Sequence, residues 1–297
     1  MDGKANIMWI CDKWTDYKVL DIANGEKLED WERYRLIRPD PQVIWDKKQK
    51  KDLWKTAHGV YHRKNTGGGF WEVKKKLPEK WNVAFEPLNL KFNIKPMGFK
   101  HTGLFPEQAV NWMWFSELIR NEKREVKVLN LFAYTGGATA AAAAAGAHVT
   151  HVDSSKGMVL WAKENLASSG LSDKPVRYLV DDVIKFVERE IRRGNKYDAI
   201  IMDPPSYGRG PNGEVWKLED ELFPLVLKCM EIMSDNPLFF LINSYTTGLQ
   251  PAVLSNILRL TMGEKYDGEV SADEIGLPVC DSSLVLPCGA SGRWSRK

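Results

Sequence analysis

The stretch VLNLFAYTGGAT, residues 128–139, decides the fold. It begins as an apolar run, passes through a turn that contains Gly136 and Gly137, and opens into six consecutive alanines. An apolar strand that meets a glycine turn and then a strong helix-forming segment is typical of a β–turn–α unit. Such a turn brings backbone N–H groups and the positive end of the helix dipole to a ligand. We therefore predict a ligand site here, in which the two glycines leave room for close approach.

Strand and helix patterns alternate from residue 105 to about residue 245. Helical periodicity separates apolar runs of strand length, which end near residues 132, 153, 182, 203 and 245. Alternation at this spacing predicts βαβ units around a parallel sheet, and hence an α/β fold of Rossmann-like type. The tail over residues 274–297 is expected to form a hairpin that closes one edge of the sheet.

The first 98 residues follow a different pattern. Short alternating runs are separated by turn signals, such as the Asn24–Gly25 pair and the glycines near residue 67. We predict a small β-rich domain over residues 1–98 and a ligand-binding α/β domain over residues 99–297. The segment that opens the second domain is predicted to be a helix with Val110, Met113, Trp114 and Leu118 on one face.

Length and composition exclude several classes of protein. The chain has 297 residues, 43% of them hydrophobic, which is enough for one large core and one small core. No apolar run approaches the roughly 18 residues of a membrane span, and the start of the chain lacks a secretory pattern. The four cysteines are far apart and show no metal-ligand spacing with histidine. We expect a reduced, cytoplasmic protein without a bound metal.

Positive charge is concentrated at the start of the chain. Residues 1–100 carry a formal charge of +7, although the whole chain carries only +3. The runs KKQKK, HRK and KKK supply most of this excess, and seven of the twelve tryptophans lie in the first 81 residues. A basic region with exposed aromatic rings favours a polyanion such as RNA as partner. The sequence leaves the oligomeric state, monomer or dimer, open.

Three further strands of the α/β domain end in acids. Asp153 ends the strand after the glycine turn, Asp181 and Asp182 end the next strand, and Asp203 ends the one after it. The carboxyl ends of parallel strands share one sheet edge, where open α/β sheets bind ligands. Asp153 is spaced to accept hydrogen bonds from ribose hydroxyls, and a carboxylate at Asp182 can accept from an adenine amino group. Each acid taken singly could instead cap a helix.

The ligand suggested by this set is a nucleoside without a pyrophosphate. A dinucleotide fingerprint requires G-x-G-x-x-G, but Tyr134 and Thr139 occupy its first and third glycine positions. A P-loop sequence is also missing. These exclusions favour S-adenosylmethionine (SAM) as cofactor and S-adenosylhomocysteine (SAH) as product.

Taken together, the segments NLFAYTGG, DDV and MDPP resemble the class I SAM-dependent methyltransferases. The resemblance is to the branch of bacterial large-subunit (23S) ribosomal RNA methyltransferases. It covers roughly residues 88–297 and includes HTGLFPEQ and LPCGASGRW. It implies a mostly parallel seven-stranded sheet with helices on both faces, and methylation of RNA.

The resemblance also implies roles for individual residues. The turn would hold the methionine part of SAM, Asp153 the ribose, and Asp182 with Asp181 the adenine. The full cofactor-binding set comprises Phe105, Gln108, Ala133, Tyr134, Thr135, Gly136, Gly137, Asp153, Ser154, Asp181, Asp182, Val183 and Asp203.

Asp203, Pro204, Pro205 and Tyr207 are the catalytic candidates. Both prolines fix the backbone after Asp203, so this segment would form a rigid polar ledge for the methyl acceptor. Methyl transfer requires the acceptor in line with the S–CH3 bond, so positioning supplies most of the catalysis. Tyr207, which Ser206 separates from the prolines, could stack on a planar base.

The acceptor is expected to be a nitrogen or an oxygen rather than cytosine C5, with a nitrogen of an RNA base as the first candidate. Methylation of cytosine C5 needs a cysteine nucleophile, and in relatives that cysteine follows the strand that here ends in Asn243, Ser244 and Tyr245. Two alternatives stay open at this point. The enzyme could act on a protein or a small molecule, or the chain could be a non-catalytic RNA-binding protein with a SAM fold.

Overall fold

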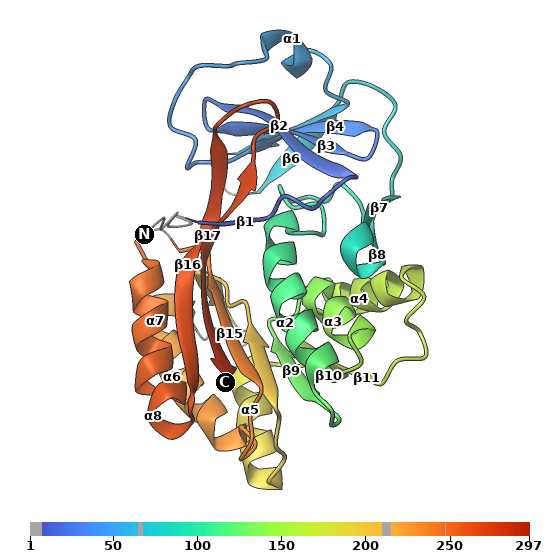
Figure 1. Ribbon diagram of the computed structural model, residues 1–297. Helices are drawn as coiled ribbons and strands as arrows, with labels where there is room; N and C mark the ends of the chain where they lie inside the picture. The colour runs from blue at the N-terminus through green and yellow to red at the C-terminus, as the bar shows by residue number, and fades with distance from the viewer. Residues whose placement is uncertain (1–7, 65–67, 210–214, 247) are drawn as a thin grey trace. The chain divides into compact units, whose positions relative to one another are not determined.

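The computed structural model describes residues 8–64, 68–209, 215–246 and 248–297. The chain divides into two compact units (Figure 1). The larger unit contains Val110–Ile275, Cys288–Lys297 and Trp9, and the smaller unit contains Ile10–Ala109 and Gly276–Pro287. The domain boundary expected at residue 98 stays a prediction.

The larger unit is built on one sheet of eight strands. Its order is β1 (Trp9–Ile10), β16 (Gly268–Pro278), β17 (Val285–Arg296), β15 (Phe239–Ser244), β12 (Ala199–Met202), β9 (Lys127–Leu131), β10 (His148–Asp153) and β11 (Val176–Val180). The five strands from β15 to β11 pair in parallel, and β17 pairs antiparallel with β15. The predicted α/β fold with a mostly parallel sheet is therefore confirmed. The eighth strand, β1, has two residues, too few for a periodic pattern in the sequence.

Helices cover both faces of this sheet (Figure 1). One face carries α2 (Ala109–Asn121), α3 (Gly137–Ala144) and α4 (Lys156–Ser168). The other face carries α5 (Val183–Arg193), α6 (Leu218–Ile232), α7 (Pro251–Leu260) and α8 (Met262–Lys265). The central strands β12 and β15 are buried along their whole length, which explains why their sequences AIIM and FFLINS are nearly continuous apolar runs.

The buried face of α2 differs from the one that its periodicity singled out. Trp112, Phe115 and Ile119 are buried, whereas Met113 is 37% exposed. The ring of Phe115 stacks on Phe239 of β15, with ring centres 5.6 Å apart. The face is therefore set by a partner strand far away in the sequence. The predicted helix is present, but periodicity alone did not identify its buried face, because it fits more than one apolar stripe.

The smaller unit is β-rich, as predicted. Its main sheet has the order β2 (Tyr17–Ala23), β3 (Glu26–Trp31), β4 (Tyr34–Pro39), β5 (Gly59–Arg63) and β6 (Gly69–Val73). A second pair is formed by β7 (Trp81–Phe85) and β8 (Leu90–Ile94), and the short helix α1 spans Lys51–Trp54. Asn24 and Gly25 both have positive φ and form the predicted turn between β2 and β3. Residues 65–67 of the other predicted turn lie outside the described residues.

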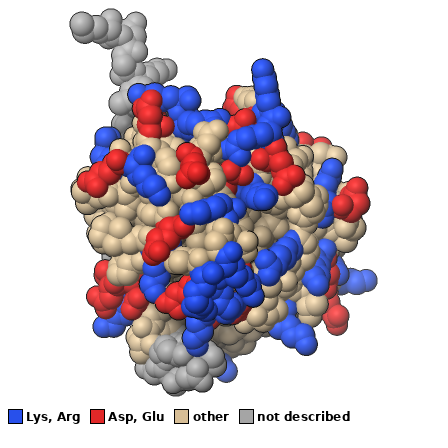
Figure 2. Space-filling view, turned by 90° about the horizontal axis from the view of Figure 1, so that it is seen from below, with Lys and Arg blue, Asp and Glu red and all other residues tan. Residues whose placement is uncertain are grey.

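Among the described residues, no helix has the length and apolar character needed to cross a membrane. On the face seen in Figure 2, Lys and Arg are interspersed with Asp and Glu. This mixture agrees with the small net charge of +3.

The two glycines of the turn make room for protein side chains. A methyl group on Gly137 would lie 2.6 Å from the ring of Trp112 on α2, and one on Gly136 would lie 2.8 Å from Cβ of Ala162 on α4. The alanines of α3 are buried against the sheet, so this helix packs very closely. We predicted that a ligand approaches both glycines, whereas in the structure side chains of α2 and α4 fill the space beside them.

This packing predicts opposite effects for two glycine substitutions at the starts of helices. Gly137→Ala should lower the free energy of unfolding by about 1–3 kcal/mol, because it overpacks the Trp112 contact. Gly157→Ala, at a site whose nearest neighbour would be 3.8 Å away, should raise it by about 0.5–1 kcal/mol. Urea unfolding of both variants checks this. Equal effects of the two substitutions would contradict it.

Candidate functional site

Four polypeptide segments meet at the carboxyl edge of the sheet. The parallel registers place Leu131 of β9 between Val152 of β10 and Met202 of β12, and Asp153 beside Val180 of β11. The residues that follow these strand ends are joined by backbone bonds. The N–H of Asp181 donates to the Asp153 carbonyl over 3.0 Å, and that of Asp203 to the Leu131 carbonyl over 3.4 Å. The structure thus brings the glycine turn and the predicted acids to one edge.

The turn after β9 has an unusual backbone. Phe132, Tyr134 and Gly136 all have positive φ, at 55°, 50° and 80°. Two of these are non-glycine residues, for which this region costs about 1–2 kcal/mol each. Such strain persists only where the surroundings hold it, and it clusters at ligand sites.

Asp153 is one of the groups that hold this turn. Its Oδ2 accepts the N–H of Tyr134 and its Oδ1 accepts the N–H of Ser155, both over 2.8 Å. Burial raises the pKa of Asp153, although these two backbone donors act in the opposite direction. Because each carboxylate oxygen has two lone pairs, the side chain keeps acceptor capacity for a ligand.

Polar side chains that the sequence argument missed support the turn from behind. Asn165 of α4 donates from Nδ2 to the Thr135 carbonyl over 2.8 Å. Thr139 Oγ1 accepts from Asn130 Nδ2 and shares a hydrogen bond with His151 Nδ1, each over 2.9 Å. Burial lowers the pKa of His151 to about 3, so this ring stays neutral near pH 7. These contacts join strands and helices in the folded chain, and no local motif signals them.

The acids after β11 have structural partners. Asp182 caps α5, because its Oδ1 accepts the N–H of Lys185 over 2.9 Å, and Asp181 forms an ion pair with Arg189. The helix after Asp153 is capped by Ser155, whose Oγ accepts from the Met158 N–H over 3.4 Å. The capping alternative therefore holds for Asp182 and not for Asp153. The predicted contacts of Asp181, Asp182 and Val183 with adenine, and of Ser154 with the cofactor, stay predictions.

The segment after β12 is held by a residue that the sequence did not single out. Trp216 donates from Nε1 to the Pro205 carbonyl over 2.6 Å, and its ring centre lies 5.3 Å from that of Phe132. Trp216 lies on β14 (Val215–Lys217), which pairs with β13 (Tyr207–Arg209). One tryptophan thus connects the catalytic candidates to the strained turn.

Within this segment, Pro204 is buried and Tyr207 is exposed. Tyr207 is 53% exposed and lies opposite Lys217 in the β13–β14 pair, so its ring is accessible for stacking. Ser206 Oγ accepts from Thr246 Oγ1 over 2.7 Å, which ties the segment to the chain that follows β15.

A buried polar cluster occupies the region at the end of β15. Asn243 Oδ1 accepts from Ser291 Oγ over 2.7 Å and from Asn111 Nδ2 over 3.1 Å. Arg293 donates to Asn111 Oδ1 and lies against the rings of Trp9 and Trp114, 3.7 Å and 4.9 Å from the ring centres. Burial lowers the pKa of Arg293 to about 9. These contacts join α2, β15 and β17. They also supply the Oδ1 atom of Asn243 with two donors from within the protein.

Phe105 and Gln108 belong to the smaller unit. Gln108 is buried at the end of the short 3₁₀ helix Pro106–Gln108, and the Phe105 ring contacts His101 with centres 5.1 Å apart. The Pro106 carbonyl accepts from Trp14 Nε1 over 2.8 Å and from Cys11 Sγ over 3.3 Å. The segment is therefore anchored within its own unit, and its contact with a cofactor stays a prediction.

The two strand-end acids are expected to respond differently to an isosteric substitution. Asp153→Asn replaces one of two oxygens that accept backbone N–H groups by a donor, so it should cost about 1–3 kcal/mol of unfolding free energy. Asp182→Asn should change stability by less than about 0.5 kcal/mol, because Asn caps a helix as well as Asp does. Chemical denaturation of both variants checks this. A larger loss for Asp182→Asn would contradict the assignment.

Comparison with known proteins agrees with this geometry. A family model described as S-adenosylmethionine-dependent methyltransferase matches residues 43–220. A protein named Ribosomal RNA large subunit methyltransferase K/L from Shewanella frigidimarina is 31% identical over 159 residues, which are 53% of this chain and 22% of that protein. The protein of the same name from Pseudoalteromonas atlantica is 34% identical over 157 residues, 50% of this chain and 21% of that one. The chain thus spans about a fifth of the length of these curated relatives.

Solved structures extend the similarity over nearly the whole chain. The crystal structure of the SAM-dependent methyltransferase from Agrobacterium tumefaciens is 38% identical, with a TM-score of 0.89, and the match covers 96% of this chain and 91% of that one. The protein SMU.776, crystallised with SAH, is 18% identical and shares the fold, with a TM-score of 0.71 and coverage of 95% and 76%. The chain therefore belongs to the SAM-dependent methyltransferase family.

Proposed function

We propose that this SAM-dependent methyltransferase methylates a nitrogen of a base in RNA, with large-subunit ribosomal RNA as substrate. The proposal rests mainly on the fixed Asp203-Pro204-Pro205 segment beside the strained turn, which is suited to hold an acceptor. The chain at the end of β15 has no cysteine, which argues against methylation of cytosine C5. The curated relatives are named Ribosomal RNA large subunit methyltransferase K/L, which supports ribosomal RNA as the substrate. The smaller unit supports a polyanion, because its sequence has 20 Lys and Arg against 15 Asp and Glu.

The residues at the sheet edge fit the cofactor. Asp153 retains lone pairs for the ribose hydroxyls, and the N-terminus of α3, which follows the turn, is suited to the carboxylate of the methionine part. SAM supplies an electrophilic methyl group on a sulfonium sulfur and leaves as SAH. The turn from Ala133 to Gly137 and Asp153 would bind and orient it.

Asp203 and the prolines would position the acceptor. The Asp203 carboxylate accepts N–H bonds from a base amino group, which directs the nitrogen lone pair toward the methyl group. The Pro205 carbonyl already accepts from Trp216 Nε1, so the side chain of Asp203 and the carbonyl of Pro204 are proposed as the main acceptors for the substrate, beside the second lone pair of Pro205. Tyr207 would stack on the base.

Nitrogen is favoured over cytosine C5 by the cysteines. Cys229 is fully buried in α6, and burial raises its pKa far above the ordinary value, so it is no nucleophile. Cys288 is also buried, and the end of β15 provides Asn243, which is engaged by Asn111 and Ser291. All four cysteines are free thiols, which supports a cytoplasmic location.

Calorimetry with SAM tests the cofactor site. The wild type should bind with micromolar affinity, and Asp153→Ala should lose binding by at least tenfold, because about 1.4 kcal/mol corresponds to tenfold and a charge-assisted hydrogen bond is worth that or more. Asp235→Ala, which removes an exposed carboxylate before β15 and outside the predicted cofactor-binding set, is the matched control and should retain at least half of the affinity. Full affinity in a folded Asp153→Ala variant would remove Asp153 from the site.

Transfer of labelled methyl groups tests the substrate. Purified ribosomal RNA without this modification should accept label, and nucleoside analysis should find it on a base nitrogen. Label in 5-methylcytidine would overturn the nitrogen assignment. Label only in protein or small-molecule fractions would overturn RNA.

The Trp216 contact predicts a selective effect on catalysis. Trp216→Phe keeps the ring contact with Phe132 but loses the hydrogen bond to Pro205, so kcat should fall about threefold to tenfold. SAM affinity should stay unchanged. Lys217→Gln, on the same strand, is the control. An unchanged kcat for Trp216→Phe would show that this bond does not position the segment.

A further inference from the structure

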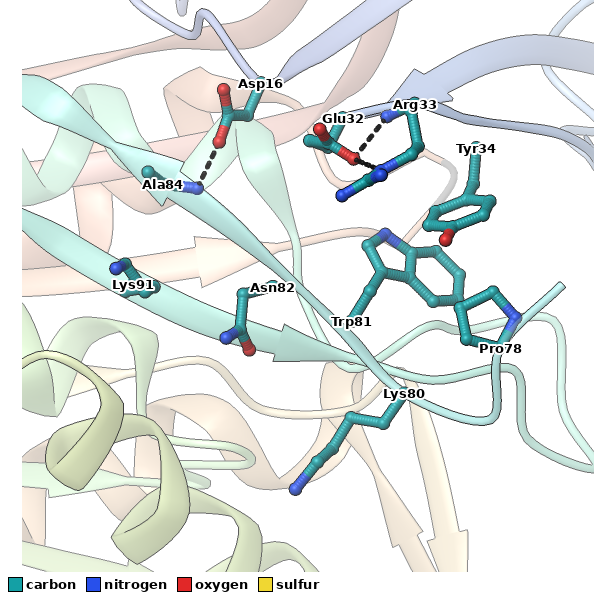
Figure 3. A pocket seen from close by; sticks show the side chains of 10 residues that line it. All are labelled: Asp16, Glu32, Arg33, Tyr34, Pro78, Lys80, Trp81, Asn82, Ala84 and Lys91. Atoms are coloured by element: carbon teal, nitrogen blue, oxygen red, sulfur yellow. Dashed lines mark hydrogen bonds and ion pairs between the residues drawn. The ribbon is translucent and has the colours of Figure 1, made fainter.

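A concavity of about 380 Å³ lies in the smaller unit, between the β3–β4 turn and the β7–β8 pair (Figure 3). We propose that this hollow, called here the Tyr34 pocket, binds one nucleotide of single-stranded RNA. Its base would stack on Tyr34 beside Arg33, and its phosphates would contact Lys80 and Lys91. The proposal rests on RNA as the substrate of the enzyme, and it assigns a binding site outside the methyl-transfer site.

One side of the Tyr34 pocket consists of rings. In Figure 3, Tyr34, Trp81 and Pro78 lie together, and the ring centres of Tyr34 and Trp81 are 4.9 Å apart. Trp81 is only 9% exposed and donates from Nε1 to the Trp31 carbonyl over 3.1 Å. It therefore holds Tyr34 as a rigid platform. The Tyr34 ring is partly exposed, and base stacking on a ring tolerates any base, because every base has a π-face.

Arg33 is held next to this platform. Its Nε and its backbone N–H both donate to one oxygen of Glu32, over 2.7 Å and 2.8 Å, and its guanidinium carbon lies 5.8 Å from the Tyr34 ring centre. A guanidinium in this position can stack on a base or pair with a phosphate.

The backbone of Glu32 gives independent support. Glu32 has φ of 60° in the two-residue turn between β3 and β4, where Trp31 pairs with Tyr34. Glycine is the usual residue for positive φ at the first position of such a turn. The backbone of a glutamate at this position is strained. The strained residue is the one whose carboxylate orients Arg33. Strain of this kind is a sign of function.

The acids of the Tyr34 pocket are committed to protein groups, and its lysines are exposed. Glu32 binds Arg33, and Asp16 Oδ2 accepts the Ala84 N–H over 2.9 Å, as Figure 3 shows. Lys80 and Lys91 are exposed, and Lys91 lies on the opposite side of the view from the rings. The rings offer a surface for a flat base, and the cations around them offer contacts for a charged backbone, so together they match the two parts of a nucleotide.

An acidic peptide is the competing partner. It would use the cations but would gain little from a preformed, partly exposed ring platform. The volume also suits one nucleotide, since small-ligand sites begin at about 300 Å³. The observations therefore favour RNA.

The test measures binding of fluorescein-labelled hexauridylate to the full chain by anisotropy, without SAM. Tyr34→Ala should weaken binding roughly 5- to 150-fold, the range expected for loss of one stacked base, whereas Tyr34→Phe should stay within twofold of wild type. The double variant Lys80→Gln/Lys91→Gln should reduce the slope of log affinity against log salt by about 1.4. The charge-matched control Lys47→Gln/Lys51→Gln should leave the Tyr34→Ala effect unchanged.

An abasic phosphate oligomer of the same length separates stacking from charge. It should bind wild type and Tyr34→Ala equally. Equal affinity of wild type and Tyr34→Ala for hexauridylate would overturn the proposal, as would equal competition by hexaglutamate and RNA. If Tyr34→Ala unfolds, the Lys80→Gln/Lys91→Gln variant becomes the test: a slope of log affinity against log salt equal to that of the wild type would overturn the proposal.

The outcome is distinguishable from failure of the proposed function. Methyl transfer to RNA with unchanged KM in Tyr34→Ala would overturn the Tyr34 pocket and keep the function. The opposite result is that Tyr34→Ala loses hexauridylate binding while the wild-type enzyme methylates only protein. That result would support the Tyr34 pocket as an RNA site and overturn the proposed function.

Discussion

The carboxylate of Asp153 joins the end of β10 to the strained turn that follows β9, through its bond to the Tyr134 N–H. Two non-glycine residues of this turn have positive φ, and their strain of about 1–2 kcal/mol each must be offset by contacts from outside the turn. Asp153 supplies one such contact from β10, and Asn165 supplies another from α4. The shape of the proposed cofactor site therefore depends on a side chain that is itself proposed to bind the cofactor.

The same edge shows how close packing and ligand binding can share residues. Gly136 and Gly137 allow α3 to approach Ala162 and Trp112, and this approach sets where the helix begins. Trp216 then connects the turn, through Phe132, to the Pro205 carbonyl of the segment that is proposed to position the acceptor. A change in one segment is expected to reach the other through this ring. Cofactor and acceptor positions would thus be set by one continuous set of contacts.

Local sequence patterns predicted the sheet, the helices and the sheet edge at which the acidic residues lie. They could do so because strand and helix periodicity involve residues that are neighbours in the sequence. Contacts between distant segments escaped prediction. The face of α2 depends on Phe239, the cluster around Arg293 depends on Asn111, 182 residues away, and the role of Trp216 depends on a hairpin. The glycine turn was identified for a ligand, yet its glycines are explained by α2 and α4. Asp182 proved to be a helix cap, which its sequence alone could not distinguish from a ligand contact.

The most direct test of the account is an NMR titration of the Asp153 carboxyl group with and without SAH. Burial should place its pKa above the ordinary value in the free protein. Ribose hydroxyls that donate to the carboxylate would favour its charged form, so SAH should lower this pKa, and SAH affinity should weaken as the pH falls through it. A pKa that is the same with and without SAH would contradict the account, because Asp153 would then hold the turn without binding the cofactor.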